Sequence, residues 1–214
     1  MDVKLIRTRK SRNNNVKGFI FDVKKHLIML LMFFIIFSGL LTGNILIKGN
    51  IETYNSVETI FENYISSLSG QTLLRIFIMQ LAVNLSSVLL NLIFGLCAIG
   101  FPVPCISLFV KGLSIGALSS FMYSEFVLKG FGYCVLVFYP IQILLCLILL
   151  KTGKESFGMS FSLLKILTDR KQKTGETSDI RLYLLRYVFL IFLTCIISFV
   201  SAVLSVYVVK LFNF

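Results

Sequence analysis

Five stretches of almost unbroken apolar residues alternate with shorter polar segments along this chain of 214 residues. Each stretch has about the 20 residues that a helix needs to cross a bilayer. We therefore predict an all-α, polytopic integral membrane helix bundle that forms a single domain over residues 27–214. The five predicted transmembrane helices cover residues 27–47, 76–99, 104–128, 131–150 and 184–209.

The polar segments predict the orientation of this bundle. Residues 1–26 carry eight Lys and Arg against two acids, and residues 151–186 carry eight against four. Residues 48–75 carry only two basic residues against three acids. Basic segments beside transmembrane helices face the cytoplasm, and four predicted helices place both basic segments on one side. The basic segment 1–26 is therefore predicted to be cytoplasmic and the C-terminus extracytoplasmic.

Two polar segments have a more specific interpretation. The predicted outer segment, residues 48–72, carries Glu52, Glu58 and Glu62 and is too short for a folded domain. It is either a docking surface for an extracytoplasmic partner or a solvated connector. After the fourth transmembrane helix, residues 156–168 fit an amphipathic helix that lies in the membrane interface after a bend near Gly153.

Composition supports a membrane protein and limits its partners. Hydrophobic residues make up 57% and charged residues 14% of the chain, against about 45–50% and about 25% in soluble domains. A net charge of +11 raises the question of nucleic acid, but the basic residues flank apolar stretches, so we expect membrane lipids and no nucleic acid as partners. The five cysteines lie in apolar runs without CxxC spacing and are interpreted as reduced, small hydrophobic residues.

Pairs of glycines mark candidate contact faces on two predicted helices. Gly39 and Gly43 share a face of the first helix, and Gly112 and Gly116 share a face of the third. Small residues at this spacing let another backbone approach closely. They indicate helix packing within the chain or contact with a partner, and a homo-oligomer is also open. Gly112→Leu or Gly116→Leu is expected to abolish partner association while the protein still inserts.

Two prolines and a lysine interrupt the apolar pattern at the start of the third predicted helix. Pro102 and Pro104 indicate a turn at the membrane surface or a break lined by neighbouring helices. Lys111 follows after about seven residues, or roughly 10 Å of helix, so its stem can snorkel to the cytoplasmic headgroups, which is the interpretation we favour. The alternative is a buried cation that pairs across helices with the freed carbonyls or with the amides of Asn84 and Asn91.

The fourth predicted helix contains a proline and an amide near its middle. Pro140 frees a carbonyl one turn earlier, near Leu136, and Gln142 follows two residues later. The freed carbonyl and the Gln142 amide can satisfy one another or bind across helices. A kink without further function is the interpretation that we favour.

Signals for catalysis are lacking in the sequence. The chain has no HExxH, GxSxG or Walker motif, and its only histidine, His26, lies at the predicted membrane entrance. No carboxylate lies near the centre of a predicted helix, which argues against proton-coupled transport. We therefore expect a protein that is not an enzyme and has no catalytic residue, cofactor or metal site.

The run GLCAIGFP from Gly95 to Pro102, followed after eight residues by Lys111-Gly112 and then Gly116, resembles the stage II sporulation protein M family. The glycine pair of the first helix, Pro140 with Gln142, and the run of Ser and Phe after the fourth helix resemble the same family. Ile141 separates Pro140 from Gln142, which departs from its sporulation branch. Gly95 and Gly100 of the run are further candidates for packing or partner contact.

The resemblance implies a membrane scaffold in the mother cell of an endospore-forming bacterium. Such proteins hold two peptidoglycan-degrading partners, the stage II sporulation proteins D and P, at the sporulation septum, where the complex remodels the wall for forespore engulfment. An alternative follows from the lysine and the prolines that break the apolar stretches. It is a small permease or channel-like subunit with a water-filled path between the second, third and fourth helices.

Overall fold

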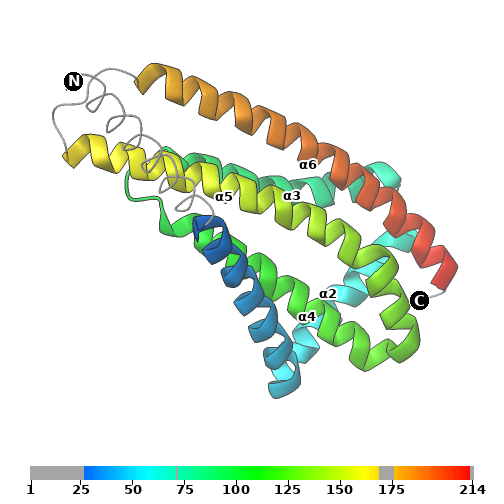
Figure 1. Ribbon diagram of the computed structural model, residues 1–214. Helices are drawn as coiled ribbons and strands as arrows, with labels where there is room; N and C mark the ends of the chain where they lie inside the picture. Colours follow the sequence, from blue (N-terminus) through cyan, green and yellow to red (C-terminus); the bar gives the residue numbers. More distant parts are fainter. Residues whose placement is uncertain (1–26, 71, 169–175, 213–214) are drawn as a thin grey trace, which may run out of the picture.

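The computed structural model describes residues 27–70, 72–168 and 176–212, and these are almost entirely helical (Figure 1). The first helix, Leu27–Gly49, precedes five further α-helices and a short π-helix. Their bounds are α2 (Ile51–Gly70), α3 (Leu73–Gly95), α4 (Pro102–Tyr133), η1 (Cys134–Phe138), α5 (Tyr139–Thr168) and α6 (Glu176–Phe212). The predicted all-α class is confirmed, and the basic segment 1–26 lies outside the described residues.

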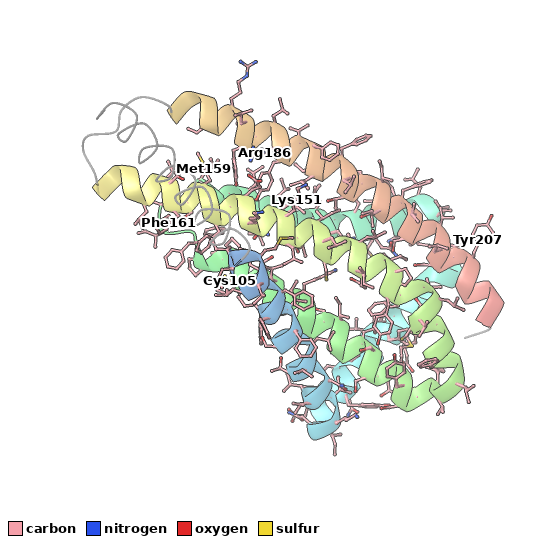
Figure 2. All side chains as sticks on the ribbon, in the orientation of Figure 1. Cys105, Lys151, Met159, Phe161, Arg186 and Tyr207 are labelled. Carbon is pink, nitrogen blue, oxygen red and sulfur yellow. The ribbon has the colours of Figure 1, made fainter. Side chains whose placement is uncertain are left out.

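Five helical segments are long and apolar enough to cross a membrane, as the sequence predicts. They are Leu27–Gly49, Leu73–Gly95, Pro102–Leu128, Gly130–Leu164 and Ile180–Tyr207. Many of their apolar side chains are exposed, among them Phe33, Leu147 and Phe189, each by more than half. Figure 2 shows Tyr207 pointing away from the bundle near the end of α6. Apolar surface of this extent is what lipid covers in a membrane protein.

Successive transmembrane helices run in opposite directions, so their ends alternate between two ends of the bundle (Figure 1). The connection from α3 to α4 lies at one end, which we call the Pro102 end. The helix α2 and the turn from α4 into η1 lie at the other, which we call the α2 end. The charge pattern predicts that the Pro102 end faces the cytoplasm.

The predicted outer segment forms a helix that packs against α4. In α2, Tyr54, Val57 and Phe61 follow a helical spacing and form one apolar face. Phe61 is buried, and its ring lies 5.5 Å from the ring of Phe121 in α4, while Tyr54 lies 5.4 Å from the same ring. The polar composition of residues 48–72 hid this face because only every third or fourth residue contributes to it.

The predicted interfacial helix is the continuation of α5. Residues 156–168 are helical, but the expected bend near Gly153 is wrong, because α5 runs without interruption from Tyr139 to Thr168. Gly153 is buried, and a side chain there would meet Leu108 at 3.5 Å and Met32 at 3.6 Å. These are ordinary contact distances, so a Cβ fits at this position, and Gly153 does not end α5.

Two irregularities shape the turn between α4 and α5 at the α2 end. Val127 has a φ of 39°, a backbone conformation that a β-branched residue rarely adopts, and the chain changes direction there. The π-helix η1 then precedes Pro140, and the amide of Tyr139 donates to the carbonyl of Cys134 five residues earlier. A π-turn accommodates the proline, which has no amide hydrogen and whose ring crowds the preceding turn. The expected kink at Pro140 is thus a π-helical turn.

Candidate functional site

The two predicted glycine pairs face each other within the chain. A Cβ added at Gly39 or Gly43 in the first helix would collide with the backbone of Phe109 or Leu113 in α4. Conversely, Gly112 and Gly116 of α4 are buried against the backbone carbonyls of Ile36 and Leu40 in the first helix. Of the two alternatives, packing within the chain and contact with a partner, the structure shows packing within the chain. Gly112→Leu is therefore expected to separate the first helix from α4. The variant would then disturb the bundle itself, so it does not test partner association selectively.

Gly95 and Gly100 are also enclosed by the chain itself. A side chain at Gly95, the last residue of α3, would collide with the hydroxyl of Tyr183 and with Ser156. Gly100 is buried in the connection to α4, where a Cβ would collide with the backbone of Phe94. Since all six candidate glycines are buried, none of them offers a free surface to a partner.

Pro102 and Pro104 lie in the first turn of α4 and confirm the turn rather than the break. Amides of the first turn have no partner within a helix, so proline costs nothing there. Pro104 is fully buried and lies against Gly153 of α5. The Cβ of Pro104 would be 3.6 Å from a Cβ added to that glycine. Neither proline opens a discontinuous helix of the kind that lines transporter cavities.

A cluster of hydroxyl groups holds the end of α3 at the Pro102 end. Tyr187 is fully buried, and its hydroxyl donates to the carbonyl of Thr152 at 2.8 Å and lies 2.6 Å from Ser156 Oγ. Ser156 Oγ also donates to the carbonyl of Asn91, and Tyr183 donates to the carbonyl of Leu92 at 3.0 Å. Asn91 and Leu92 lie near the end of α3, so these hydrogen bonds tie that end of the helix to α5 and α6. We call these residues the hydroxyl cluster: Asn91, Thr152, Ser156, Tyr183 and Tyr187.

Lys111 points into the interior of the bundle, so the favoured prediction that it snorkels to the headgroups is wrong. Its Nζ lies 3.5 Å from Asn84 Oδ1. Asn84 lies 11 residues from either end of α3, near the middle of the transmembrane helix. In turn, Asn84 Nδ2 donates to Ser198 Oγ of α6 at 3.2 Å. The predicted alternative, pairing across helices with an amide, is correct for Asn84, whereas Asn91 belongs to the hydroxyl cluster.

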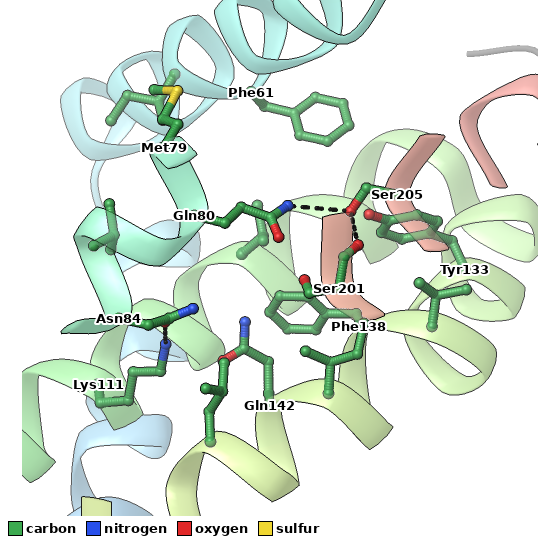
Figure 3. Close-up of a pocket in the computed structure, with 16 residues that line it drawn as sticks. Phe61, Met79, Gln80, Asn84, Lys111, Tyr133, Phe138, Gln142, Ser201 and Ser205 are labelled. Atoms are coloured by element: carbon green, nitrogen blue, oxygen red, sulfur yellow. Dashed lines mark hydrogen bonds between the residues drawn. The ribbon is translucent and has the colours of Figure 1, made fainter. Parts of the chain in front are cut away.

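Lys111 and Asn84 line a pocket of about 310 Å³ in the α2 half of the bundle (Figure 3). Figure 3 shows Asn84, Lys111 and Gln142 converging at one end of it. Across the other end, Gln80 Nε2 donates to Ser205 Oγ at 3.3 Å. The remaining wall is mainly apolar. The lining also includes Ile60 of α2, Met79 and Val83 of α3, and Ser201 and Ser205 of α6.

The sequence left Gln142 either to pair with the carbonyl freed by Pro140 or to bind across helices, with a kink without further function as the favoured interpretation. The structure places its side chain along the pocket. Its Oε1 is buried and has no hydrogen-bond partner. The π-turn before Pro140 takes up the effect of the proline, which leaves the amide free to point at the cavity. Of the predicted intramembrane polar residues, the structure therefore brings Lys111 and Gln142 together in one site.

Three polar lining residues, Gln80, Ser201 and Ser205, were missed by the sequence analysis, which named only Asn84 as a possible partner of Lys111. Gln80 and Asn84 are four residues apart in α3, and Ser201 and Ser205 are four residues apart in α6. Polar residues at this spacing share a helix face, and in an apolar helix that face turns away from lipid. The same spacing in two apolar stretches was the signal available in the sequence.

A second polar contact fixes α2 to α4 outside this pocket. The hydroxyl of Tyr54 donates to the carboxylate of Glu125, near the end of the third transmembrane segment. This hydrogen bond, together with burial and the charge of Glu125, raises the pKa of Tyr54 to about 12. Glu125 is thus engaged by α2 and is not the partner of Lys111.

The described side chains offer little reactive chemistry. No group of three or more His, Cys, Asp and Glu residues is arranged to hold a metal within the described ranges. All five cysteines are free, as predicted. In the hydroxyl cluster each hydroxyl is hydrogen-bonded and Asn91 Oδ1 is left without a partner, whereas the pocket combines a cation, amides and hydroxyls around open space. The pocket is therefore the candidate binding site.

Comparisons with protein-family models, with curated proteins and with solved structures gave no match. The resemblance to stage II sporulation protein M therefore stays a prediction from the sequence motifs.

Proposed function

We propose that this chain is a non-enzymatic membrane scaffold that holds peptidoglycan-degrading partners, the stage II sporulation proteins D and P, at the sporulation septum. In this proposal it lies in the mother-cell membrane and serves forespore engulfment. The motif resemblance supports the choice of partners. The observation that carries a scaffolding role is α2, a helix outside the five transmembrane segments that is fixed to the bundle and leaves one face exposed.

The two faces of α2 differ in the way that a docking helix requires. One face carries Tyr54 and Phe61 and packs on α4. The opposite face exposes Glu52, Asn55 and Glu62. The helix contains three glutamates and no lysine or arginine. An anchored acidic face favours a partner with a basic surface, because complementary charge increases the rate and specificity of association.

The proposal requires α2 to be extracytoplasmic, which cysteine labelling in intact cells tests. In a background without the five native cysteines, Asn55→Cys is expected to react with a membrane-impermeant maleimide, and Arg181→Cys is expected to react only after the cells are opened. Both positions are exposed, one at the α2 end and one near the start of α6. The reverse pattern would place α2 in the cytoplasm and rule out contact with wall-degrading enzymes.

Charge reversal on the exposed face tests the docking role. Glu52→Lys combined with Glu62→Lys is expected to weaken recovery of the D and P partners, because two surface contacts become repulsive and cost about 2 kcal/mol, or roughly thirtyfold in Kd. Arg181→Glu changes an exposed charge at the Pro102 end and is the matched control. If the double variant inserts normally and recovers both partners as the unaltered chain does, the α2 face is not the docking surface.

A small permease or channel-like subunit is the second candidate, and the pocket is the observation that favours it. The pocket lies between α3, α4 and α5, where a water-filled path was expected. Labelling of an introduced cysteine tests for such a path. Ser107 and Ser114 of the third transmembrane helix do not line the pocket, whereas Ser201 of α6 does, so Ser201→Cys is the suitable probe. Labelling of this cysteine by impermeant reagents from both sides of the membrane supports a transport path, and labelling from neither side argues against it.

A further inference from the structure

The strongest unexplained feature of the molecule is the uncompensated charge of Lys111. Its hydrogen-bond partner is the neutral amide of Asn84, and among the described residues no carboxylate forms an ion pair with it. A lysine near the middle of a transmembrane helix costs about 2.5–3.5 kcal/mol on insertion scales. An anion beside Nζ would offset this cost, and the protein supplies none within the described ranges.

The groups around the ammonium fit the remainder of an anionic headgroup. The Gln142 side chain converges with Lys111 and Asn84 at one end of the pocket (Figure 3). An amide carries both donors and an acceptor, and Gln142 Oε1 is buried without a partner. Lys111 and the Gln142 amide hydrogens suit phosphate oxygens, and Gln142 Oε1 suits a hydroxyl that donates to it. A phosphate group with a neighbouring hydroxyl meets both requirements.

The size of the pocket limits the ligand to a headgroup rather than a polypeptide. Its volume is about 310 Å³. This lies at the lower limit of typical small-molecule sites. A transmembrane helix of a partner, with a diameter of about 10 Å, does not enter such a space.

The wall on the α2 and α3 side is apolar and faces outward. Met79 and Val83 of the transmembrane helix α3 line the pocket and are 58% and 61% exposed, and Ile60 of α2, which is 68% exposed, lines it beside them. Outward-facing apolar residues of a transmembrane helix contact lipid, so this wall joins the polar end of the pocket to the acyl-chain region. A ligand with an apolar tail would leave the pocket by this side.

We propose that the pocket between α3, α4, α5 and α6 binds a phosphate-bearing anionic headgroup at Lys111 and Gln142, with its acyl chains leaving between α2 and α3. A lipid of the phosphatidylglycerol type has this chemistry. The site is independent of the proposed scaffold function, because partner recovery and lipid binding are separate measurements made with different variants.

The absence of tryptophan from the chain allows a direct test. Met79→Trp places a single fluorophore at the outward wall, and Phe189→Trp places one on a lipid-facing part of α6 away from the pocket. Each protein is reconstituted in phosphatidylcholine vesicles that contain increasing amounts of brominated phosphatidylglycerol or brominated phosphatidylcholine, which quench tryptophan on contact. At Met79→Trp we expect about a tenfold preference for the anionic lipid, the size of one hydrogen bond to a charged group. At Phe189→Trp we expect none.

Charge variants then locate the preference. Adding Lys111→Met to Met79→Trp is expected to abolish it, whereas Lys111→Arg retains it and Lys151→Met, at an exposed lysine of α5, leaves it unchanged. If Lys111→Met does not fold, Gln142→Glu places a negative charge at the same end of the pocket and is expected to abolish the preference. An equal preference at both tryptophan positions, or one that survives Lys111→Met and Gln142→Glu, overturns the proposal.

A soluble competitor distinguishes a lipid from a free phosphate ester. Glycerol 3-phosphate is expected to displace the brominated anionic lipid only in large excess, because it lacks the acyl chains that contact the apolar wall. Displacement at concentrations comparable with those of the lipid would show that the recognised ligand is water-soluble and overturn the assignment to lipid.

Discussion

The hydroxyl cluster and the Lys111 pocket are two polar regions inside one apolar bundle, and they satisfy their polar groups in opposite ways. In the hydroxyl cluster, every side-chain hydroxyl is hydrogen-bonded, Tyr187 and Ser156 are fully buried, and only the amide oxygen of Asn91 lacks a partner. In the pocket, Lys111 has one long contact with an amide, Gln142 Oε1 has none, and open space remains between them. A polar group buried without a partner is costly, so the first region stabilises the fold and the second suits a ligand.

The largest expected effect comes from crowding the hydroxyl cluster. Gly95→Leu puts a side chain into the hydroxyl of Tyr183 and into Ser156, which should cost about 3 kcal/mol or more and deplete folded protein. Gly158→Leu, at an exposed glycine of α5 with no atom within 4 Å of an added Cβ, is the control. With the other four cysteines replaced, heating in mild detergent with a thiol-reactive dye measures the difference, since Cys134 is buried and reacts on unfolding. Equal unfolding midpoints for the two variants would contradict the packing described for Gly95.

Removing one hydroxyl from the cluster should have a smaller effect of the same sign. Tyr187→Phe deletes the hydrogen bonds to Thr152 and Ser156 and leaves buried polar groups behind, which is expected to cost about 1–2 kcal/mol. Tyr207→Phe removes the same atom from a side chain that is 68% exposed and should leave the unfolding midpoint unchanged. A midpoint that does not fall in Tyr187→Phe would show that the cluster contributes nothing to stability.

The pocket should respond with the opposite sign. Lys111→Met removes a charge that has no ionic partner among the described side chains, so the stability of the unliganded protein is expected to stay the same or rise by up to about 1 kcal/mol. The same dye assay in a zwitterionic detergent, with Lys151→Met as control, measures this change. A fall comparable with that of Tyr187→Phe would mean that Lys111 is a structural residue and would remove the contrast between the two regions.

The smallest effect is expected at Gln142. Gln142→Leu replaces an amide whose Oε1 has no partner by an apolar group of similar size, so stability should change by only a few tenths of a kcal/mol. Hydrogen exchange of the α5 amides should likewise be unchanged. Clear destabilisation would indicate that the Gln142 amide is held by groups of the protein and is not available to a ligand.

The sequence by itself determined the all-helical class and the five transmembrane segments, and it marked the two prolines and the paired glycines as places where a helix starts or breaks and where helices or a partner approach closely. Each of these follows from local requirements: the thickness of the bilayer, the missing amide hydrogen of proline, and the need for small residues where backbones touch. The amphipathic face of α2 was also present in the sequence, but its polar neighbours concealed it.

Only the tertiary structure decided which groups meet. It pairs Gly39 and Gly43 with the backbone of α4, turns Lys111 toward Asn84 instead of the headgroups, and aims Gln142 into a pocket instead of at the carbonyl near Pro140. These outcomes depend on the rotation and spacing of helices that are far apart in the chain. The physical reason is that an apolar sequence pattern specifies that a helix lies in the membrane, whereas close packing with its neighbours sets which of its faces turns inward.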